Sequence, residues 1–318
     1  MTERRAVQIL TLVCQDRVGI VAAVSGALAG IDGFILDSQQ YADLETGRFF
    51  MRVAFVRGGD RYPAEAEALR AAIAPVAETF GFDWSLDAAE ARPRVLIAVS
   101  KGSHCLNDLL HRWRTKTLPV DIAGVVSNHD SLRPLAEWHG LPWHHLPVDD
   151  TNRDAQEAAI LALMAEARAD YLILARYMQV LGPRLVEGLA GRCINIHHSF
   201  LPGFKGAQPY HRAHARGVKL IGATAHFVTA DLDEGPIIEQ AVERVDHRAS
   251  VDDLIRIGRD IEAQVLARAV ASVGERRVFL NGNRTVIFRG LYRRCRPQRR
   301  SAARRASIRT RPPRRARR

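Results

Sequence analysis

The sequence predicts two α/β domains, a small N-terminal βαββαβ domain and a Rossmann-like domain built on a mostly parallel sheet. The first 90 residues follow the order strand, helix, strand, strand, helix, strand. From Arg94 onward, short apolar runs alternate with helical stretches, and strands without polar alternation are typical of a parallel sheet covered on both faces. Pro93 lies between the two patterns. We therefore expect domains over residues 1–90 and 94–288.

The N-terminal elements follow from hydrophobic spacing. Residues 6–14 are apolar on both alternating sets of positions, which suits a short buried strand. After a turn at Asp16–Gly19, apolar residues at helical spacing predict a helix that stops before Gly33. The remaining elements are predicted to be a strand, a second strand, a helix and a last strand, at Phe34–Ala42, Arg48–Arg57, Ala64–Phe80 and Phe82–Leu86.

The second domain begins with four short apolar strands and the helices between them. The strands are predicted at Val95–Val99, Val120–Val126, Tyr171–Leu174 and Cys193–Ile196. The helices are predicted near Leu106–Arg114, Ala155–Arg168 and Arg184–Leu189. Two long strands, a helix and a closing hairpin around Asn281-Gly282 follow, at Leu220–Val228, Ile237–Glu243, Val251–Ala271, Arg277–Leu280 and Thr285–Phe288.

Composition places the chain among cytoplasmic globular proteins. Its 318 residues are 47% hydrophobic, enough for two cores, and no apolar run of about 18 residues predicts a membrane span. The N-terminus has no apolar signal core. The cysteines are scattered without a CxxC pair, so we expect reduced thiols at Cys14, Cys105, Cys193 and Cys295.

The net charge of +11 comes from the C-terminal segment. Residues 289–318 hold fourteen arginines and no acidic residue, so removing them from +11 leaves −3 for residues 1–288. The segment has few apolar residues and no periodicity, which predicts disorder. One interpretation is an arm that binds nucleic acid or an acidic surface. The other is a solvated extension without a defined role. We favour the extension, so nucleic acid is not an expected partner.

The most informative motif is NIHHSFLPGFKGAQPY, residues 195–210. It starts at the C-terminal end of a predicted parallel strand, where open α/β sheets bind ligands. Asn195 and His197 are two residues apart, so on a strand their side chains point to the same side. An amide donor beside an imidazole suits the oxygen of a carbonyl group under attack.

A second motif, AHFVTADLDEGPII at residues 225–238, carries a strand into an acidic turn. Asp231, Asp233 and Glu234 crowd together there. Like charges at short range raise the pKa of at least one carboxyl group. We therefore expect a carboxyl group that exchanges protons near neutral pH.

These two motifs resemble the catalytic core of the folate-dependent formyltransferases. Within that family the chain is most similar to the formyltetrahydrofolate deformylases, which use water as the acceptor of the formyl group. Residues 14–25, CQDRVGIVAAVS, resemble an ACT domain, a ferredoxin-like βαββαβ sensor of small molecules. The resemblance covers residues 6–288. It implies hydrolysis of 10-formyltetrahydrofolate to tetrahydrofolate and formate, and a place in one-carbon metabolism and purine biosynthesis.

The resemblance implies roles for individual residues. Asn195, His197 and Asp233 would be catalytic. Asn195 and protonated His197 would stabilise the oxyanion, and Asp233 would orient the water. The folate substrate would be bound by Met178, Gln179, Val180, Leu181, His198, Gly206, His226, Thr229 and Asp231. Each residue also has a plainer interpretation: a loop histidine, the end of a strand, a turn aspartate, or, for Met178, Val180 and Leu181, core packing.

Metals and other cofactors are not expected. The adjacent pairs His144-His145 and His197-His198 lack the i, i+4 helical spacing of a zinc site. In the implied reaction, 10-formyltetrahydrofolate is a substrate rather than a cofactor. The site residues therefore supply all the expected chemistry.

The sequence differs from the family's pattern in two regions, and these differences bear on the identity of the acceptor and on regulation. The turn Ser100–Cys105 has one glycine, a poor cradle for the phosphate of a ribonucleotide acceptor, which favours water. In the ACT-like segment, Val18 replaces a usual proline and Phe34 a common asparagine. An amino-acid effector, glycine or methionine, would bind at Asp16, Gly19 and Ile20. The alternative is a domain that pairs subunits, and we expect a homo-oligomer.

Three function classes remain open at this point. The first is the deformylase. The second is a transformylase with an amine acceptor such as glycinamide ribonucleotide. The third is a non-catalytic regulator that contains an ACT domain.

Overall fold

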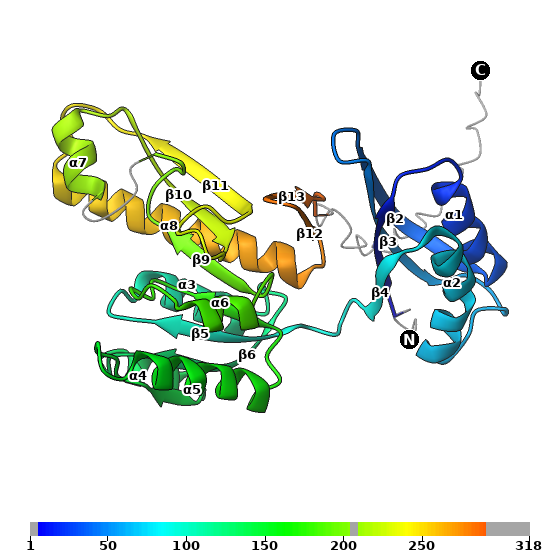
Figure 1. Ribbon diagram of the computed structural model, residues 1–318, viewed down its shortest axis with the longest axis horizontal. Helices are drawn as coiled ribbons and strands as arrows, with labels where there is room; N and C mark the ends of the chain where they lie inside the picture. Colours follow the sequence, from blue (N-terminus) through cyan, green and yellow to red (C-terminus); the bar gives the residue numbers. More distant parts are fainter. Residues whose placement is uncertain (1–5, 204–208, 291–318) are drawn as a thin grey trace, which may run out of the picture. The chain divides into compact units, whose positions relative to one another are not determined.

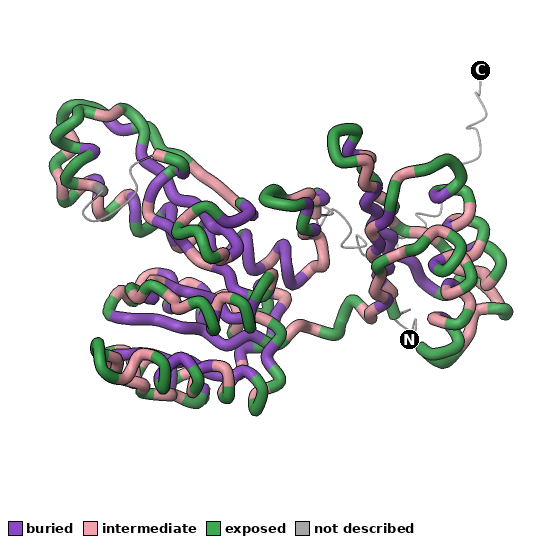
Figure 2. Tube along the Cα trace, viewed as in Figure 1, coloured by how far each residue is buried: buried purple, intermediate pink, exposed green. Residues whose placement is uncertain are grey.

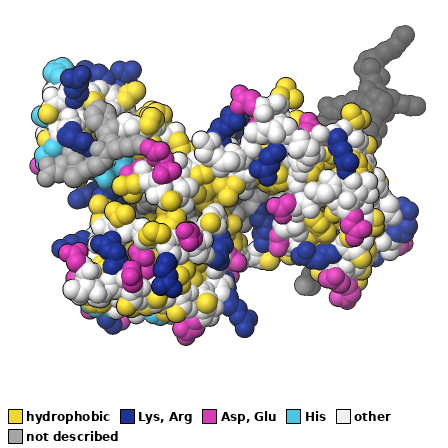
Figure 3. Space-filling view, in the orientation of Figure 1, with side chains coloured by type: hydrophobic (Ala, Val, Ile, Leu, Met, Phe, Trp, Pro, Cys, Tyr) yellow, Lys and Arg dark blue, Asp and Glu magenta, His cyan; other side chains and the backbone are white. Residues whose placement is uncertain are grey.

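The computed structural model describes residues 6–203 and 209–290 (Figure 1). Internal contacts group Met1–Phe288 as one unit, apart from Arg289–Arg318. The arginine-rich segment predicted to be disordered and Cys295 fall almost wholly outside the described residues. On the face drawn in Figure 3, acidic and basic side chains are interspersed. Among the described helices, none combines the length and apolarity needed to span a bilayer.

The N-terminal region forms a four-stranded antiparallel sheet in the order β2-β3-β1-β4. This is the predicted βαββαβ arrangement, and it is ferredoxin-like. Every predicted element is present, with ends that differ by at most two residues. The elements are β1 (Gln8–Gln15), α1 (Ile20–Gly30), β2 (Gly33–Asp43), β3 (Arg48–Arg57), α2 (Ala66–Phe80) and β4 (Asp83–Ala88).

Both faces of β3 are covered, which explains its continuous apolar sequence. One face packs with α1 and α2 in a core that includes Met51 and Phe55. On the other face, Phe50 packs against a C-terminal hairpin, β12 (Val278–Asn281) and β13 (Arg284–Ile287), through Phe279 and Phe288. The hairpin therefore ties the end of the chain to the N-terminal sheet.

The closing hairpin has a shorter turn than the sequence indicated, because its strands end at Asn281 and resume at Arg284 rather than at Leu280 and Thr285. Asn281 pairs with Arg284, so Gly282 and Asn283 are the two central residues of the turn. Gly282 has a φ of 62°, and a positive φ at the first central position is what glycine permits there. Asn281 is thereby freed to donate from Nδ2 to Oδ2 of Asp43 at 2.6 Å.

A seven-stranded sheet forms the second region, in the order β11-β10-β9-β8-β5-β6-β7. The five strands from β9 to β7 are parallel, and β10 and β11 are antiparallel. This confirms the mostly parallel sheet. The strands are β5 (Arg94–Val99), β6 (Asp121–Ser127), β7 (Trp143–His145), β8 (Tyr171–Leu174), β9 (Cys193–His197), β10 (Leu220–Phe227) and β11 (Ile237–Arg244).

Helices cover both faces of this sheet, as the unalternating apolar strands predict. Val95, Ile97 and Val99 of β5 pack in a core with α3 (His104–Arg114) and α8 (Val251–Gly274). The alternate residues Leu96 and Ala98 pack with α5 (Arg153–Glu166) and α6 (Pro183–Gly188). Figure 2 shows the central strands of the sheet as buried, whereas the edge strands β11 and β7 are mostly intermediate or exposed.

Three short elements were not predicted: β7, α4 (Arg133–Trp138) and α7 (Pro209–Arg216). The first two are three and six residues long, too short for a periodicity to develop. In α7 the sequence PYHRAHAR is mostly polar. The end of the first motif therefore belongs to a helix, because Pro209 begins α7.

Candidate active site

A cavity opens where β8 and β9 end and where β10 passes beside β9. Its volume is about 600 Å³. The motif residues line it from both strands: Asn195, Ile196 and His197 from β9, and His226 from β10. The parallel strands place their carboxyl ends at this edge, as the position of the first motif predicts.

Register brings the two motifs together. In the antiparallel pairing of β9 and β10, Asn195 lies opposite His226. Nδ2 of Asn195 is 3.4 Å from Nε2 of His226. Nδ1 of His226 lies 2.8 Å from the carbonyl oxygen of Phe227, which only accepts, so Nδ1 carries the hydrogen. Nε2 of neutral His226 can then accept from Asn195, which fixes the orientation of the amide.

Asp233 completes the group from the loop after β10. Its Oδ1 is 3.1 Å from Nδ1 of His197 and 3.8 Å from Nε2 of His226. Asp233 has a φ of 59°, a left-handed conformation that non-glycine residues seldom adopt. Gly235 permits the loop's return, because a Cβ there would overlap the carbonyl oxygen of Phe227.

The expectation of a raised carboxyl pKa in the acidic turn is wrong for Asp233. The hydrogen bond with His197 lowers the pKa of Asp233 below its usual value, and the electrostatic interaction with His197 lowers it further, although burial opposes both effects. Asp233 is therefore an ionised acceptor at neutral pH. Burial lowers the pKa of His226, which keeps that ring neutral beside it.

His197 retains one unused nitrogen. Its side chain is 6% exposed, and Nε2 is buried without a hydrogen-bond partner in the described part of the chain. A buried polar nitrogen without a partner is costly unless a ligand pairs with it. Nε2 of His197 together with Nδ2 of Asn195 is thus suited to an oxygen that develops negative charge.

All but one of the other residues predicted to bind the folate line the cavity. Those that line the cavity are Met178, Gln179, Val180, Leu181, His198, His226, Thr229 and Asp231. Gly206 lies outside the described residues. Met178 and Val180 are 58% and 59% exposed, so they are not core residues. Plain core packing is therefore excluded for these two side chains.

The expected effector residues lie at the turn between β1 and α1. Asp16 donates its backbone N–H to Gly47, and Gly19 precedes α1 with a φ of 100°. The side chain of Ile20 is buried in the N-terminal core. Whether this turn binds an amino acid stays a prediction.

Sequence reasoning missed several polar residues in the cavity wall. Among them are His104, Arg176, Tyr210, Arg259 and Glu262. One signal was present: Glu262 falls within the otherwise apolar buried stripe of α8. A carboxylate at such a position needs partners, and finding them requires the tertiary structure.

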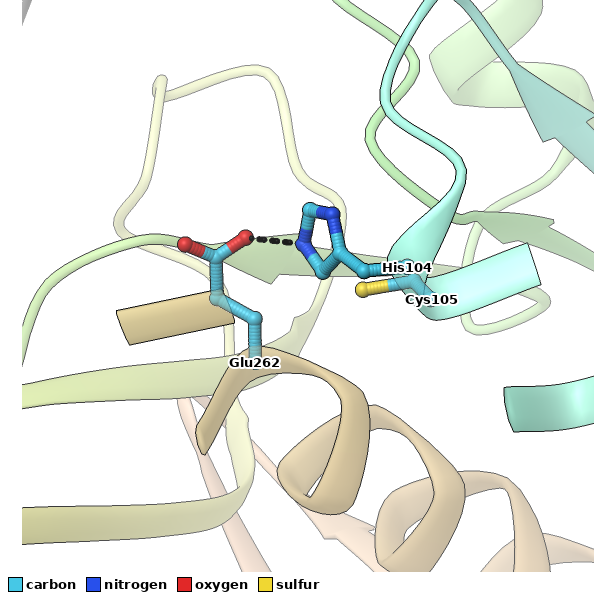
Figure 4. Close-up of side chains that lie close together, drawn as sticks. All are labelled: His104, Cys105 and Glu262. Carbon is cyan, nitrogen blue, oxygen red and sulfur yellow. Dashed lines mark hydrogen bonds and ion pairs between the residues drawn. The ribbon is translucent and has the colours of Figure 1, made fainter. Parts of the chain in front are cut away.

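Three side chains near the cavity have the spacing of a metal site. Ligand atoms of His104, Cys105 and Glu262 all lie within 4.8 Å of one another (Figure 4). The carboxylate, however, already faces the guanidinium of Arg176 at 3.4 Å. Burial raises the pKa of the Cys105 thiol well above its usual value, which disfavours the thiolate that a metal requires. The donor set therefore does not fit a metal ion.

Comparisons with known proteins agree with the motifs. Residues 93–270 match the family model described as formyl transferase. A formyltetrahydrofolate deformylase of Corynebacterium sp. (strain P-1) is 49% identical over 281 residues, covering 88% of this chain and 98% of that protein.

Solved structures of a deformylase and of a transformylase match this chain to different extents. A formyltetrahydrofolate deformylase from Pseudomonas syringae pv. tomato str. DC3000 is 46% identical, with a TM-score of 0.86 over 91% of this chain and 96% of the other. Glycinamide ribonucleotide transformylase 1 from Symbiobacterium toebii is 31% identical, with a TM-score of 0.58 over 62% of this chain and 95% of the other. The likeness to the deformylase thus covers far more of the chain.

Proposed function

Because this chain belongs to the formyltetrahydrofolate deformylases, hydrolases of the N10-formyl group, we propose that Asn195, His197 and Asp233 catalyse its hydrolysis of 10-formyltetrahydrofolate. The observation that carries this assignment is the short His197–Asp233 contact beside Asn195, at the end of β9. The unpaired Nε2 of His197 supports it.

Asn195, His197 and Asp233 each have a role in the proposed reaction. The formyl oxygen binds between Nδ2 of Asn195 and His197, and ionised Asp233 orients a water molecule toward the formyl carbon. Attack forms a tetrahedral intermediate whose negative oxygen both donors stabilise. The Asp233 carboxylate stabilises the positive charge of protonated His197. The bond from carbon to N10 then breaks, N10 takes a proton through Asp233 or His197, and tetrahydrofolate and formate leave.

The folate occupies the apolar part of the cavity in this proposal. Met178, Val180 and Leu181 offer apolar surface, and Gln179 and the backbone of residues 229–233 offer hydrogen-bonding groups. The exposure of Met178 and Val180 supports a surface that is covered only when the pterin ring binds. No cofactor takes part, since the side chains supply the donors and the base.

An amine acceptor is the less favoured function. Curated relatives that match over 88% of the chain are deformylases. The assay is formate release from 10-formyltetrahydrofolate with purified protein and no added acceptor. Wild-type protein should release formate catalytically, and Asn195→Ala should slow release by about 10²–10³. Turnover only in the presence of an amine would assign the chain to the transferases instead.

We also propose a separate role for each of three segments of the chain. Residues 1–90 form an ACT-type regulatory domain, residues 94–288 the catalytic domain, and residues 289–318 a tail without a catalytic role. Phe34 and Leu36 on the edge strand β2 are 60% and 48% exposed, which supports pairing of subunits in a homo-oligomer. Activity measured with added glycine or methionine tests regulation at Asp16, Gly19 and Ile20. We place the enzyme in the cytoplasm.

A further inference from the structure

Five polar side chains in the cavity wall take no part in the reaction proposed above. They form what we call the Glu262 cluster: His104, Arg176, His198, Tyr210 and Glu262. Its centre is the carboxylate of Glu262, whose side chain is 1% exposed. His104, Tyr210 and Arg176 reach it from α3, from α7 and from the loop after β8. Segments far apart in the sequence are therefore joined at this one buried charge.

Both oxygens of Glu262 are occupied. Oε2 accepts from Nε2 of His104 at 2.8 Å and lies 3.4 Å from Nε of Arg176. Oε1 accepts from the Tyr210 hydroxyl at 2.7 Å. These partners lower the pKa of Glu262 although burial acts to raise it. The carboxylate is thus ionised, fully paired and unable to serve as a free base.

Gly258 shows how closely the cluster is built. A Cβ at this position would overlap the hydroxyl of Tyr210. A glycine in the interior of α8 costs about 1 kcal/mol relative to alanine. The close passage of Tyr210 across the helix accounts for its presence.

The cluster also determines which nitrogen of His198, the residue next to His197, carries the hydrogen. Arg176 donates from one guanidinium nitrogen to Nδ1 of His198 at 2.8 Å, because a guanidinium only donates. The hydrogen of the neutral ring then lies on Nε2. The His198 ring stacks on His197, with centroids 4.9 Å apart and an angle of 22° between planes. Burial, with the charges of Arg176 and His197, lowers the pKa of His198 to about 4.

We propose that the Glu262 cluster is the specificity determinant that restricts the acceptor to water, by presenting amines with the Arg176 guanidinium and with a carboxylate whose two oxygens are already paired, so that the wall offers no free base. This inference rests on the proposed function. An amine is mostly an ammonium ion at neutral pH, and Arg176 repels it. It must also lose a proton before it can attack, and Glu262 has no free oxygen to take that proton. Water is neutral and needs only Asp233.

The two reactions differ in one product. With water, a carbon–oxygen bond forms, the bond between carbon and N10 breaks, and formate and the N10–H folate result. With an amine, a carbon–nitrogen bond forms in its place, the amine loses one proton, N10 gains one, and the product is an N-formyl amine. The ratio of N-formyl amine to formate therefore reports acceptor choice directly.

The experiment incubates the full-length protein with 10-formyltetrahydrofolate and glycinamide, and measures formate and N-formylglycinamide by mass spectrometry. In Arg176→Ala we expect a product ratio about tenfold above wild type, hydrolytic kcat about tenfold lower, and KM within about threefold. Arg176→Lys should restore most of both values, because a lysine can donate to His198. Arg112→Ala is the matched control: this arginine pairs with Asp108 at 2.7 Å on the surface, and its removal should change neither value.

An unchanged product ratio in folded Arg176→Ala would overturn the inference. If that variant lacks a cooperative thermal transition, His198→Gln decides by the same criterion: a raised ratio supports the inference and a wild-type ratio contradicts it. Wild-type protein that releases no formate without glycinamide would defeat the proposed function, and the inference with it. Wild-type hydrolysis with unaltered ratios in the variants defeats the inference alone.

Discussion

Nδ1 of His197 lies 3.1 Å from Oδ1 of Asp233, although 35 positions separate them in the sequence. The contact exists because β10 returns antiparallel to β9 and its following loop folds back at Gly235. The hydrogen bond lowers the pKa of Asp233. An ionised carboxylate beside His197 supports the proposed role of this pair in stabilising an oxyanion.

Asp233→Asn is expected to lower kcat by about 10³-fold and leave KM within several-fold. The amide has no charge to stabilise protonated His197 or to orient water, whereas the exposed apolar surface at Met178–Leu181 is unaltered. Steady-state formate release measures both constants. Asp246→Asn is the control, since this carboxylate pairs with Arg248 at 2.8 Å on the surface. Near wild-type kcat in Asp233→Asn would remove Asp233 from the mechanism.

The neutral state of His198 should make the folded protein sensitive to acid. Its folded pKa of about 4 lies below the ordinary 6.5, so between these values the unfolded chain binds a proton that the folded chain does not. Wild-type protein should therefore lose stability relative to His198→Gln as pH falls from 6.5 to 4, by up to about 3 kcal/mol.

Urea unfolding of wild type and His198→Gln at pH 7.5, 5.5 and 4.5 measures this difference. The groups around His198 that set the shift are Arg176, His197, Glu262 and Asp233, with the Tyr210 ring against it. A difference in unfolding free energy that does not change with pH would show that the ring is protonated in the folded state.

Gly235→Ala is expected to reduce kcat at least about tenfold while the protein stays folded. The new methyl group would overlap the carbonyl oxygen of Phe227, so the loop that carries Asp233 must move. Gly26→Ala in α1 is the matched control, because its Cβ meets nothing within 4 Å. That variant should be active and no less stable, since alanine favours a helix. Circular dichroism and formate release compare the two.

Asn281→Ala should destabilise the protein by about 1–3 kcal/mol with little change in kcat. It removes the 2.6 Å hydrogen bond from a buried side chain to the buried carboxylate of Asp43, which keeps its hydrogen bonds from Glu45 and Thr46. Asn283→Ala, two residues away on the exposed turn, should change stability by less than about 0.5 kcal/mol. Equal midpoints of urea unfolding for both variants would count against the role of this contact.

The sequence by itself determined the fold class and the strand order along the chain. Hydrophobic spacing is local, and it predicted β3 at Arg48–Arg57 and β8 at Tyr171–Leu174 with their observed ends. The same spacing placed Asn195 and His197 on one side of a strand at the ligand-binding edge. These features follow from steric preferences and solvent exposure within a few residues.

The tertiary structure decided which charges meet. Nothing in the hydrophobic spacing indicates that Arg176 and Tyr210 both contact Glu262. The three residues come from separate segments, which meet only because α7 and α8 pack near the sheet edge. The direction of the Asp233 pKa reversed for the same reason. Sequence neighbours predicted repulsion between carboxylates, whereas the fold placed His197, from another strand, 3.1 Å from the carboxylate of Asp233. Electrostatic interactions depend on distance through space and on burial, and both are set by long-range packing.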